Sequence, residues 1–105
     1  MKLWIDDVRP APEGYMLCTS VNNAKCMIEI IEREILFANL NTKIELIDID
    51  HDAGDYAYDG GDYIKLLDWL EATGRNYPIK IHSMNPVGVQ NMRAIIQRNG
   101  WTEVK

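Results

Sequence analysis

Apolar residues occur along the chain in two patterns: short runs, and longer stretches in which they recur every three or four residues. The short runs predict five β-strands, at residues 3–5, 15–18, 44–49, 78–82 and 101–104. The periodic stretches between them predict helices at about 21–38, 62–73 and 85–98. Because strands alternate with helices, we expect an α/β fold of about five mostly parallel strands with helices on both faces.

Residues with capping side chains indicate where the helices begin. Thr19 or Ser20 can cap the first helix, and Asp62 is placed to cap the second. Asn85, which a proline follows, predicts the start of the third. Residues 7–14, between the first two strands, leave no room for a helix. An extended segment of this length can still return along a short strand, so we expect the two strands to lie in one sheet.

Length and composition limit the class of protein. The chain has 105 residues, of which 47% are apolar and 26% charged, the balance of an ordinary globular protein. At this length we expect a single domain over residues 1–105. No apolar run approaches the roughly 20 residues that a membrane span needs. Cys18 and Cys26 form no Cys-x-x-Cys pair, so the expectation is a reduced, cytoplasmic protein.

Negative charge is concentrated in two short stretches. The formal net charge is −5, but residues 44–62 contain seven acidic residues and no lysine or arginine. Together with Asp6 and Asp7 these stretches carry −9, which leaves +4 on the rest of the chain. This distribution argues against an extended nucleic-acid-binding face and favours a site for a cation.

Three predicted strands end in residues that can bind a metal or move a proton. Both histidines of the chain are among them, because the three ends read Asp6-Asp7, Asp50-His51-Asp52 and His82-Ser83. The carboxyl ends of parallel strands meet at one edge of a sheet, where ligands bind. Two carboxylates about 4 Å apart repel by roughly 4 kcal/mol at an effective dielectric constant of 20. A divalent cation held by oxygen ligands would remove this repulsion, and such ligands suit Mg²⁺ or Mn²⁺.

These residue types predict chemistry on a phosphate group. The expected metal ligands are the aspartates at the first and third strand ends, Asp6, Asp7, Asp50 and Asp52. Asp50 could instead act as a nucleophile, and His51 and His82 could transfer protons. Ser83 and Arg9 could contact phosphate oxygens. Each residue also has an ordinary structural explanation, such as an ion-paired histidine or a solvated turn, and only the coincidence of three polar strand ends favours a functional site.

The polar strand ends resemble those of receiver domains, and more closely those of the cyclic-phosphate-processing receiver domains. The matching segments are Leu3–Pro12, Asp50–Asp55 with Gly60–Tyr63, and Ile81–Pro86 with Asn91-Met92. The resemblance implies a flavodoxin-like, three-layer α/β fold and a metal-dependent role on phosphate esters, with a cyclic phosphate on a nucleotide or an RNA end as the substrate. It implies that Asp6 and Asp7 hold the metal and that Asp50 stands where receivers are phosphorylated. Ser83 would be the hydroxyl that contacts phosphate.

Two departures from ordinary receivers leave other functions open. The lysine that receivers place after their fifth strand has only Lys105 as a counterpart, and no segment follows that could form the last receiver helix. We therefore expect a fold truncated at that helix and a metal-dependent phosphoesterase. The alternatives are a signalling domain phosphorylated on Asp50 and a phosphate-binding module without catalysis.

Overall fold

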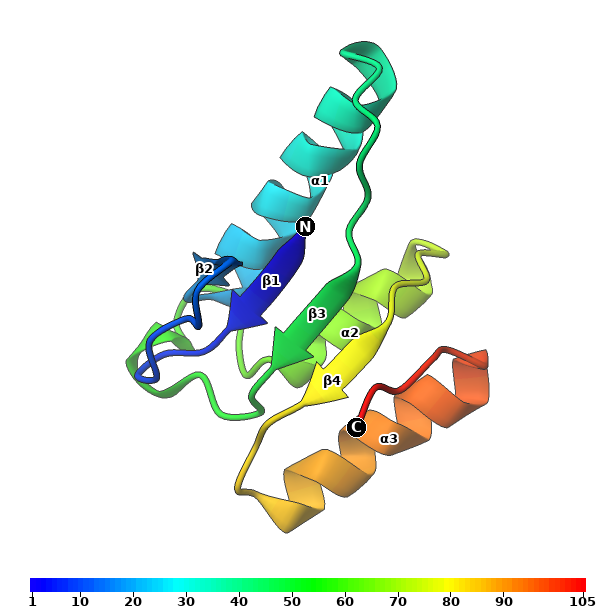
Figure 1. The fold of residues 1–105 in the computed structure, drawn as a ribbon. Coiled ribbons are helices and arrows are strands. Elements are labelled where there is room, and N and C mark those ends of the chain that lie inside the picture. The colour runs from blue at the N-terminus through cyan, green and yellow to red at the C-terminus, as the bar shows by residue number, and fades with distance from the viewer.

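The structure, a computed structural model, describes all 105 residues and contains a parallel sheet of four strands (Figure 1). Its strands lie in the order β2-β1-β3-β4. Their bounds are Lys2–Ile5 for β1, Tyr15–Cys18 for β2, Leu46–Ile49 for β3 and Ile79–Ile81 for β4. The helices are α1 at Val21–Phe37, α2 at Ile64–Ala72 and α3 at Pro86–Asn99, and a 3₁₀ turn, η1, spans Gly54–Tyr56. The receiver-like α/β fold predicted from the sequence is confirmed.

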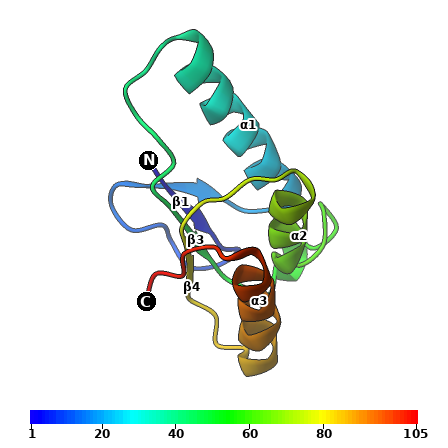
Figure 2. The same ribbon diagram turned by 90° about the vertical axis from the view of Figure 1, so that its right-hand side faces the viewer.

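All three helices pack on one face of the sheet (Figure 2). Leu3 and Ile5 of β1 point to this face and lie in the same buried cluster as Ile28 of α1, Leu66 of α2 and Met92 of α3. The sequence predicted helices on both faces of the sheet and three layers. The structure has helices on one face only, so the fold has two layers.

The handedness of the crossovers explains this one-sided arrangement. The connections β2 to β3 and β3 to β4 step through the sheet in one direction, so right-handed crossovers place their helices on the same face. The step from β1 to β2 runs in the opposite direction, and a helix there would lie on the other face. That connection is short and contains no helix, so the other face stays uncovered.

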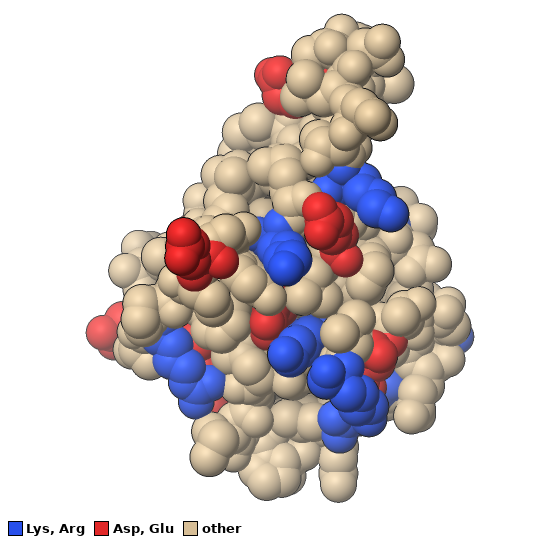
Figure 3. All heavy atoms as spheres, viewed as in Figure 1, with Lys and Arg blue, Asp and Glu red and all other residues tan.

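Side chains on the uncovered face follow from the strand register. Trp4 of β1 lies beside Asp48 of β3 and Leu17 of β2, and Asp48 lies beside Lys80 of β4. Since successive side chains of a strand point to opposite faces, these residues share the face opposite Leu3 and Ile5. Figure 3 views the molecule from this side and shows basic side chains spread over it, with acidic ones between them.

The predicted fifth strand at 101–104 was wrong in extent. Only one residue of it pairs with the sheet, through an isolated bridge between Glu103 and Ile79. The amide of Ile79 donates to the carbonyl of Thr102, and the amide of Val104 donates back to Ile79. Trp101 instead turns into the hydrophobic core. The backbone thus touches the edge of the sheet for a single residue, and four strands remain.

The capping residues predicted from the sequence are confirmed for two of the three helices. Ser20 accepts a hydrogen bond from the amide of Asn23 at the start of α1, and Asn85 accepts one from the amide of Gly88 in α3. The predicted cap at Asp62 was wrong, because α2 begins after Tyr63 and has no side-chain cap. Asp62 instead accepts from the amide of Ala53 at 3.0 Å, which closes the loop that carries the acidic residues. None of the three α-helices combines the length and apolar character that crossing a membrane requires.

Candidate functional site

The carboxyl ends of β1, β3 and β4 bring three potential ligands together. One carboxylate oxygen of Asp6, one of Asp50 and one ring nitrogen of His82 all lie within 4.8 Å of one another. These residues are 44 and 32 positions apart in the sequence, and the parallel sheet alone places them at one edge. The convergence that the sequence predicted is present for these three residues, which we call the Asp6–Asp50–His82 cluster.

Asp6 is fully buried and held in a fixed orientation. Its Oδ1 accepts hydrogen bonds from the amides of Val8 at 3.0 Å and Arg9 at 3.1 Å, while its Oδ2 lies 2.8 Å from Nε2 of His82. Burial alone would raise the pKa of Asp6. The two amides and His82 stabilise the charged form more strongly, so the pKa of Asp6 is lowered. The contacts of Asp6 therefore favour its charged form.

His82 lies between two buried carboxylates. Its Nδ1 is 2.6 Å from Oδ1 of Asp48, and its Nε2 faces Asp6. The imidazole also stacks on the indole of Trp4, with ring centroids 3.9 Å apart and planes 4° from parallel. Burial alone would lower the pKa of His82, but the hydrogen bonds and negative charges of Asp48 and Asp6 outweigh this effect and raise it. Both ring nitrogens thus have partners within the chain.

Asp7 shows the repulsion expected among clustered carboxylates. Burial raises the pKa of Asp7, and the neighbouring charges of Asp6 and Asp50 raise it further. The side chain of Asp7 lies directly against Gly54, where an added Cβ would come within 2.3 Å of Oδ2 of Asp7. Gly54 also has a positive φ of 55°, which a larger residue rarely adopts. The loop after β3 therefore needs glycine here to approach the first strand end.

His51 belongs to a second group at the same edge. Its Nδ1 lies 2.8 Å from Oδ1 of Asp52, and ligand atoms of His51, Asp52 and Asp62 lie within 4.8 Å of one another. Nε2 of His51 has no hydrogen-bond partner in the chain. The imidazole packs on Gly88 at the start of α3, where an added Cβ would come within 2.5 Å of the ring. Asp52 is therefore grouped with His51, whereas Asp50 is grouped with Asp6 and His82.

The two residues predicted to contact phosphate have partners in the chain as well. Oγ of Ser83 accepts a hydrogen bond from the amide of Asn85 at 3.1 Å. One guanidinium nitrogen of Arg9 donates to the carbonyl of His82 at 2.6 Å, and its other N–H groups make no hydrogen bond in the chain. The indole N–H of Trp4 donates to the carbonyl of Arg9 at 3.0 Å. Arg9 therefore ties the first loop to the end of β4.

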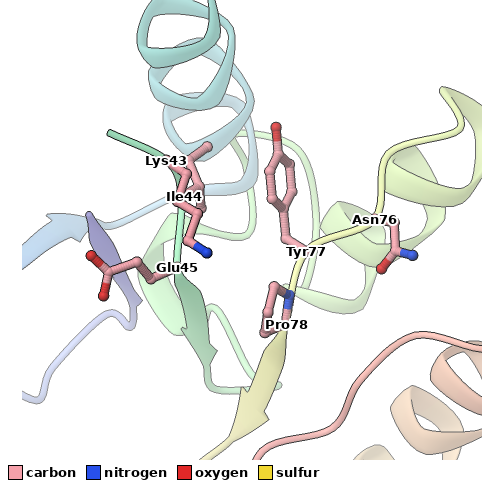
Figure 4. A pocket seen from close by; sticks show the side chains of 6 residues that line it. All are labelled: Lys43, Ile44, Glu45, Asn76, Tyr77 and Pro78. Atoms are coloured by element: carbon pink, nitrogen blue, oxygen red, sulfur yellow. The ribbon is translucent and has the colours of Figure 1, made fainter. Parts of the chain in front are cut away.

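A separate hollow of about 500 Å³ lies at the opposite edge of the sheet (Figure 4). It is formed by residues before β3 and β4, and the side chains that line it are Lys43, Ile44, Glu45, Asn76, Tyr77 and Pro78. It offers one lysine and one glutamate and no convergent group of ligands. None of the predicted site residues lines this hollow; they lie at the carboxyl ends of β1, β3 and β4 and in the loops that follow, which we call the acidic edge.

Sequence reasoning missed three residues that shape the site: Asp48, Trp4 and Gly88. Asp48 is 3% exposed and partners His82, although its position in an apolar strand gave no functional signal beyond the cost of burying a charge. Trp4, an apolar strand residue that packing alone would explain, stacks on the imidazole of His82. Gly88 did carry a signal, since a glycine inside a predicted helix indicates a close approach by another group.

The fold and the acidic edge define a receiver-like α/β protein with an aspartate and histidine cluster where its parallel strands end. Residues 1–98 match the family described as the cyclic-phosphate processing receiver domain. Because this match covers nearly the whole chain, the chain belongs to that family, as the resemblance in the sequence predicted. Neither a curated protein nor a solved structure gives a significant match.

Proposed function

We propose that this protein is a metal-dependent phosphoesterase that hydrolyses a cyclic phosphate on a nucleotide or an RNA end. The observation that carries the proposal is the convergence of Asp6, Asp50 and His82 within 4.8 Å at the ligand-binding edge of the sheet. Family membership supports the substrate, because the family is one of cyclic-phosphate processing.

The residues present fit a divalent cation. Asp6 and Asp50 bring two carboxylates together, and their charges raise the pKa of the neighbouring Asp7 beyond what burial alone does. We assign Asp6, Asp7 and Asp50 to the metal, whereas Asp52 orients His51. When bound, a dication supplies Lewis-acid activation of a phosphoryl oxygen and compensates the charge that develops on it.

His51 is the residue that we assign to proton transfer. Of the two histidines, it alone has a ring nitrogen without a partner, and the contact of Nδ1 with Asp52 fixes the direction in which Nε2 points. In the reaction a water oxygen forms a bond to phosphorus while one P–O bond of the cyclic ester breaks. Nε2 of His51 takes the proton that the water loses and returns it to the leaving alkoxide, which yields a phosphomonoester and a free hydroxyl.

We assign phosphate binding to groups beside the Asp6–Asp50–His82 cluster. The free N–H groups of Arg9 and the hydroxyl hydrogen of Ser83 are donors at this edge. Charge-assisted bonds from a guanidinium suit a phosphate, and they orient the ester toward the attacking water.

The test is turnover of a nucleoside 2′,3′-cyclic phosphate with Mn²⁺ or Mg²⁺, measured as release of the phosphomonoester. Asp50→Asn should abolish turnover, and His51→Gln should lower kcat by about 10²- to 10⁴-fold, the usual contribution of a proton-transferring residue. Lys65→Gln, on the exposed surface of α2, is the matched control and should keep full turnover. Folded, metal-bound protein that releases no product would contradict the proposal. A gain of one phosphoryl mass from acetyl phosphate, lost in Asp50→Asn, would indicate the signalling alternative instead.

A further inference from the structure

We infer that His82 binds the metal through Nε2, held in place by Asp48, and that the site therefore selects a transition-metal dication such as Mn²⁺ over Mg²⁺. The inference rests on the proposed function for the presence of a metal. It goes beyond that proposal because it assigns a nitrogen ligand, a positioning residue and a metal preference.

The first support is that the His82 imidazole cannot turn away from the cluster. The ring lies flat on the Trp4 indole, and the backbone carbonyl of His82 is held by Arg9. The side chain of His82 is only 12% exposed. A ligand that is already oriented before the ion arrives loses little conformational freedom when it binds.

The second support is the identity of the partner at Nδ1. Asp48 is an acceptor whose side chain is 4% exposed, and it lies 2.6 Å from Nδ1. A hydrogen bond at this position places a proton on Nδ1, and the other nitrogen, Nε2, faces Asp6. Metal-binding histidines commonly donate their second N–H to a carboxylate in this way, which fixes the ring and makes the free nitrogen a stronger ligand. Asp48 is thus a positioning residue that acts through His82.

The third support is the spacing of the ligand atoms. Nε2 of His82 and Oδ2 of Asp6 are 2.8 Å apart. Two ligands about 2.1 Å from one ion and at right angles to each other are separated by roughly 3 Å. An ion that replaces this contact releases to solvent the proton that Nε2 and Oδ2 share in it, and the two atoms need to separate only slightly. Asp50, which has an oxygen within 4.8 Å of an Asp6 oxygen and of a ring nitrogen of His82, then supplies a further ligand.

The metal preference follows from the donor atoms. Mg²⁺ binds almost entirely through oxygen and gives up its water reluctantly, whereas first-row transition metals accept imidazole nitrogen readily. An imidazole beside the carboxylates of Asp6 and Asp50 therefore makes the site bind Mn²⁺ more tightly than Mg²⁺. This refines the expectation from the sequence, which considered oxygen ligands alone.

The inference can be tested by pulsed electron paramagnetic resonance of the protein loaded with Mn²⁺. The chain has two histidines, so a directly bound nitrogen can be assigned by substitution. We expect a ¹⁴N coupling that His51→Gln retains and His82→Gln loses. In a binding titration, Asp48→Leu should lower the affinity for Mn²⁺ by about 10- to 100-fold, the usual effect of removing such a carboxylate partner. Asp48→Asn, whose side-chain oxygen can still accept a hydrogen bond from Nδ1 of His82, should lower the affinity for Mn²⁺ less.

Each outcome separates this inference from the proposed function. Mn²⁺ bound without a ¹⁴N coupling, or a coupling that His82→Gln retains, overturns the role of His82 while turnover decides the proposed function independently. Equal affinity for Mg²⁺ and Mn²⁺ overturns the metal preference. A ¹⁴N coupling in a protein that does not hydrolyse cyclic phosphates leaves this inference standing and contradicts the proposed function. Circular dichroism of each variant establishes that it is folded before its metal affinity is compared.

Discussion

The close packing of His51 on Gly88 allows a prediction in which two effects of one substitution have opposite sign. Replacing Gly88 by alanine adds a Cβ that would lie 2.5 Å from Cγ of His51 and 2.6 Å from Cδ2. These separations are far below ordinary contact, so the imidazole must move. Gly88 lies in α3, where alanine by itself is the better helix residue.

The magnitudes of the two effects can be compared. Alanine stabilises a helix by about 1 kcal/mol relative to glycine. Forcing extra volume into a packed position destabilises by roughly 1–3 kcal/mol. In the wild-type background Gly88→Ala should therefore lower the free energy of unfolding by between nearly zero and about 2 kcal/mol. In a His51→Ala background the overlap is gone, and the same substitution should stabilise by about 1 kcal/mol.

The assay is urea unfolding, followed by circular dichroism, of the wild type, both single variants and the double variant. The expected coupling between the two sites is about 1–3 kcal/mol. Val87→Ala, at an exposed neighbouring position of the same helix, is the control and should show no coupling to His51. If Gly88→Ala shifts the unfolding free energy equally in both backgrounds, the imidazole does not pack on Gly88 and the reasoning is refuted.

Two further predictions concern stability away from the acidic edge. Glu32 is hydrogen-bonded to Arg75, and this bond together with one from Tyr77 lowers the pKa of Glu32 below its ordinary value of 4.5. The stabilisation that ionised Glu32 gives the folded protein is therefore fully present above pH 4.5 and is lost as the pH falls. Between pH 7 and pH 3 the melting temperature should therefore decrease less in Glu32→Gln than in the wild type. A decline of equal size in both proteins would contradict this. Ser20 caps α1 and also donates to Asp59 at 2.6 Å, so Ser20→Ala should lower the unfolding free energy by about 1–2 kcal/mol in urea titrations, and a change near zero would show that neither bond matters.

The strand ends could be predicted from the sequence because they depend on one general rule. Aspartates and histidines after apolar runs come together when the strands are parallel, and Asp6, Asp50 and His82 do so. The grouping of Asp52 with His51 could not be predicted in the same way. It depends on how the loop after β3 folds, with Asp62 and Gly54 fixing its course.

Two features of the fold could not be predicted from the local pattern of apolar and polar residues. A helix on each face was expected from alternation of strands and helices, yet the direction of each crossover decides the face, and that depends on strand order. The last apolar run, ending at Val104, has the composition of a strand, but Trp101 is taken by the core. Competition between sheet pairing and core packing is a tertiary effect that a local pattern does not record.

The uncovered face of the sheet has a consequence for how this protein can change. Trp4 and Asp48, which support His82, lie on the side that no helix covers, apart from the cluster of Leu3 and Ile5 that stabilises the fold. Substitutions on that side can alter the surroundings of the imidazole while the interior between sheet and helices stays intact. In the site that we infer, the groups that set selectivity for an ion and the core that stabilises the fold lie on opposite sides of the same four strands, so substitutions can address each from its own side.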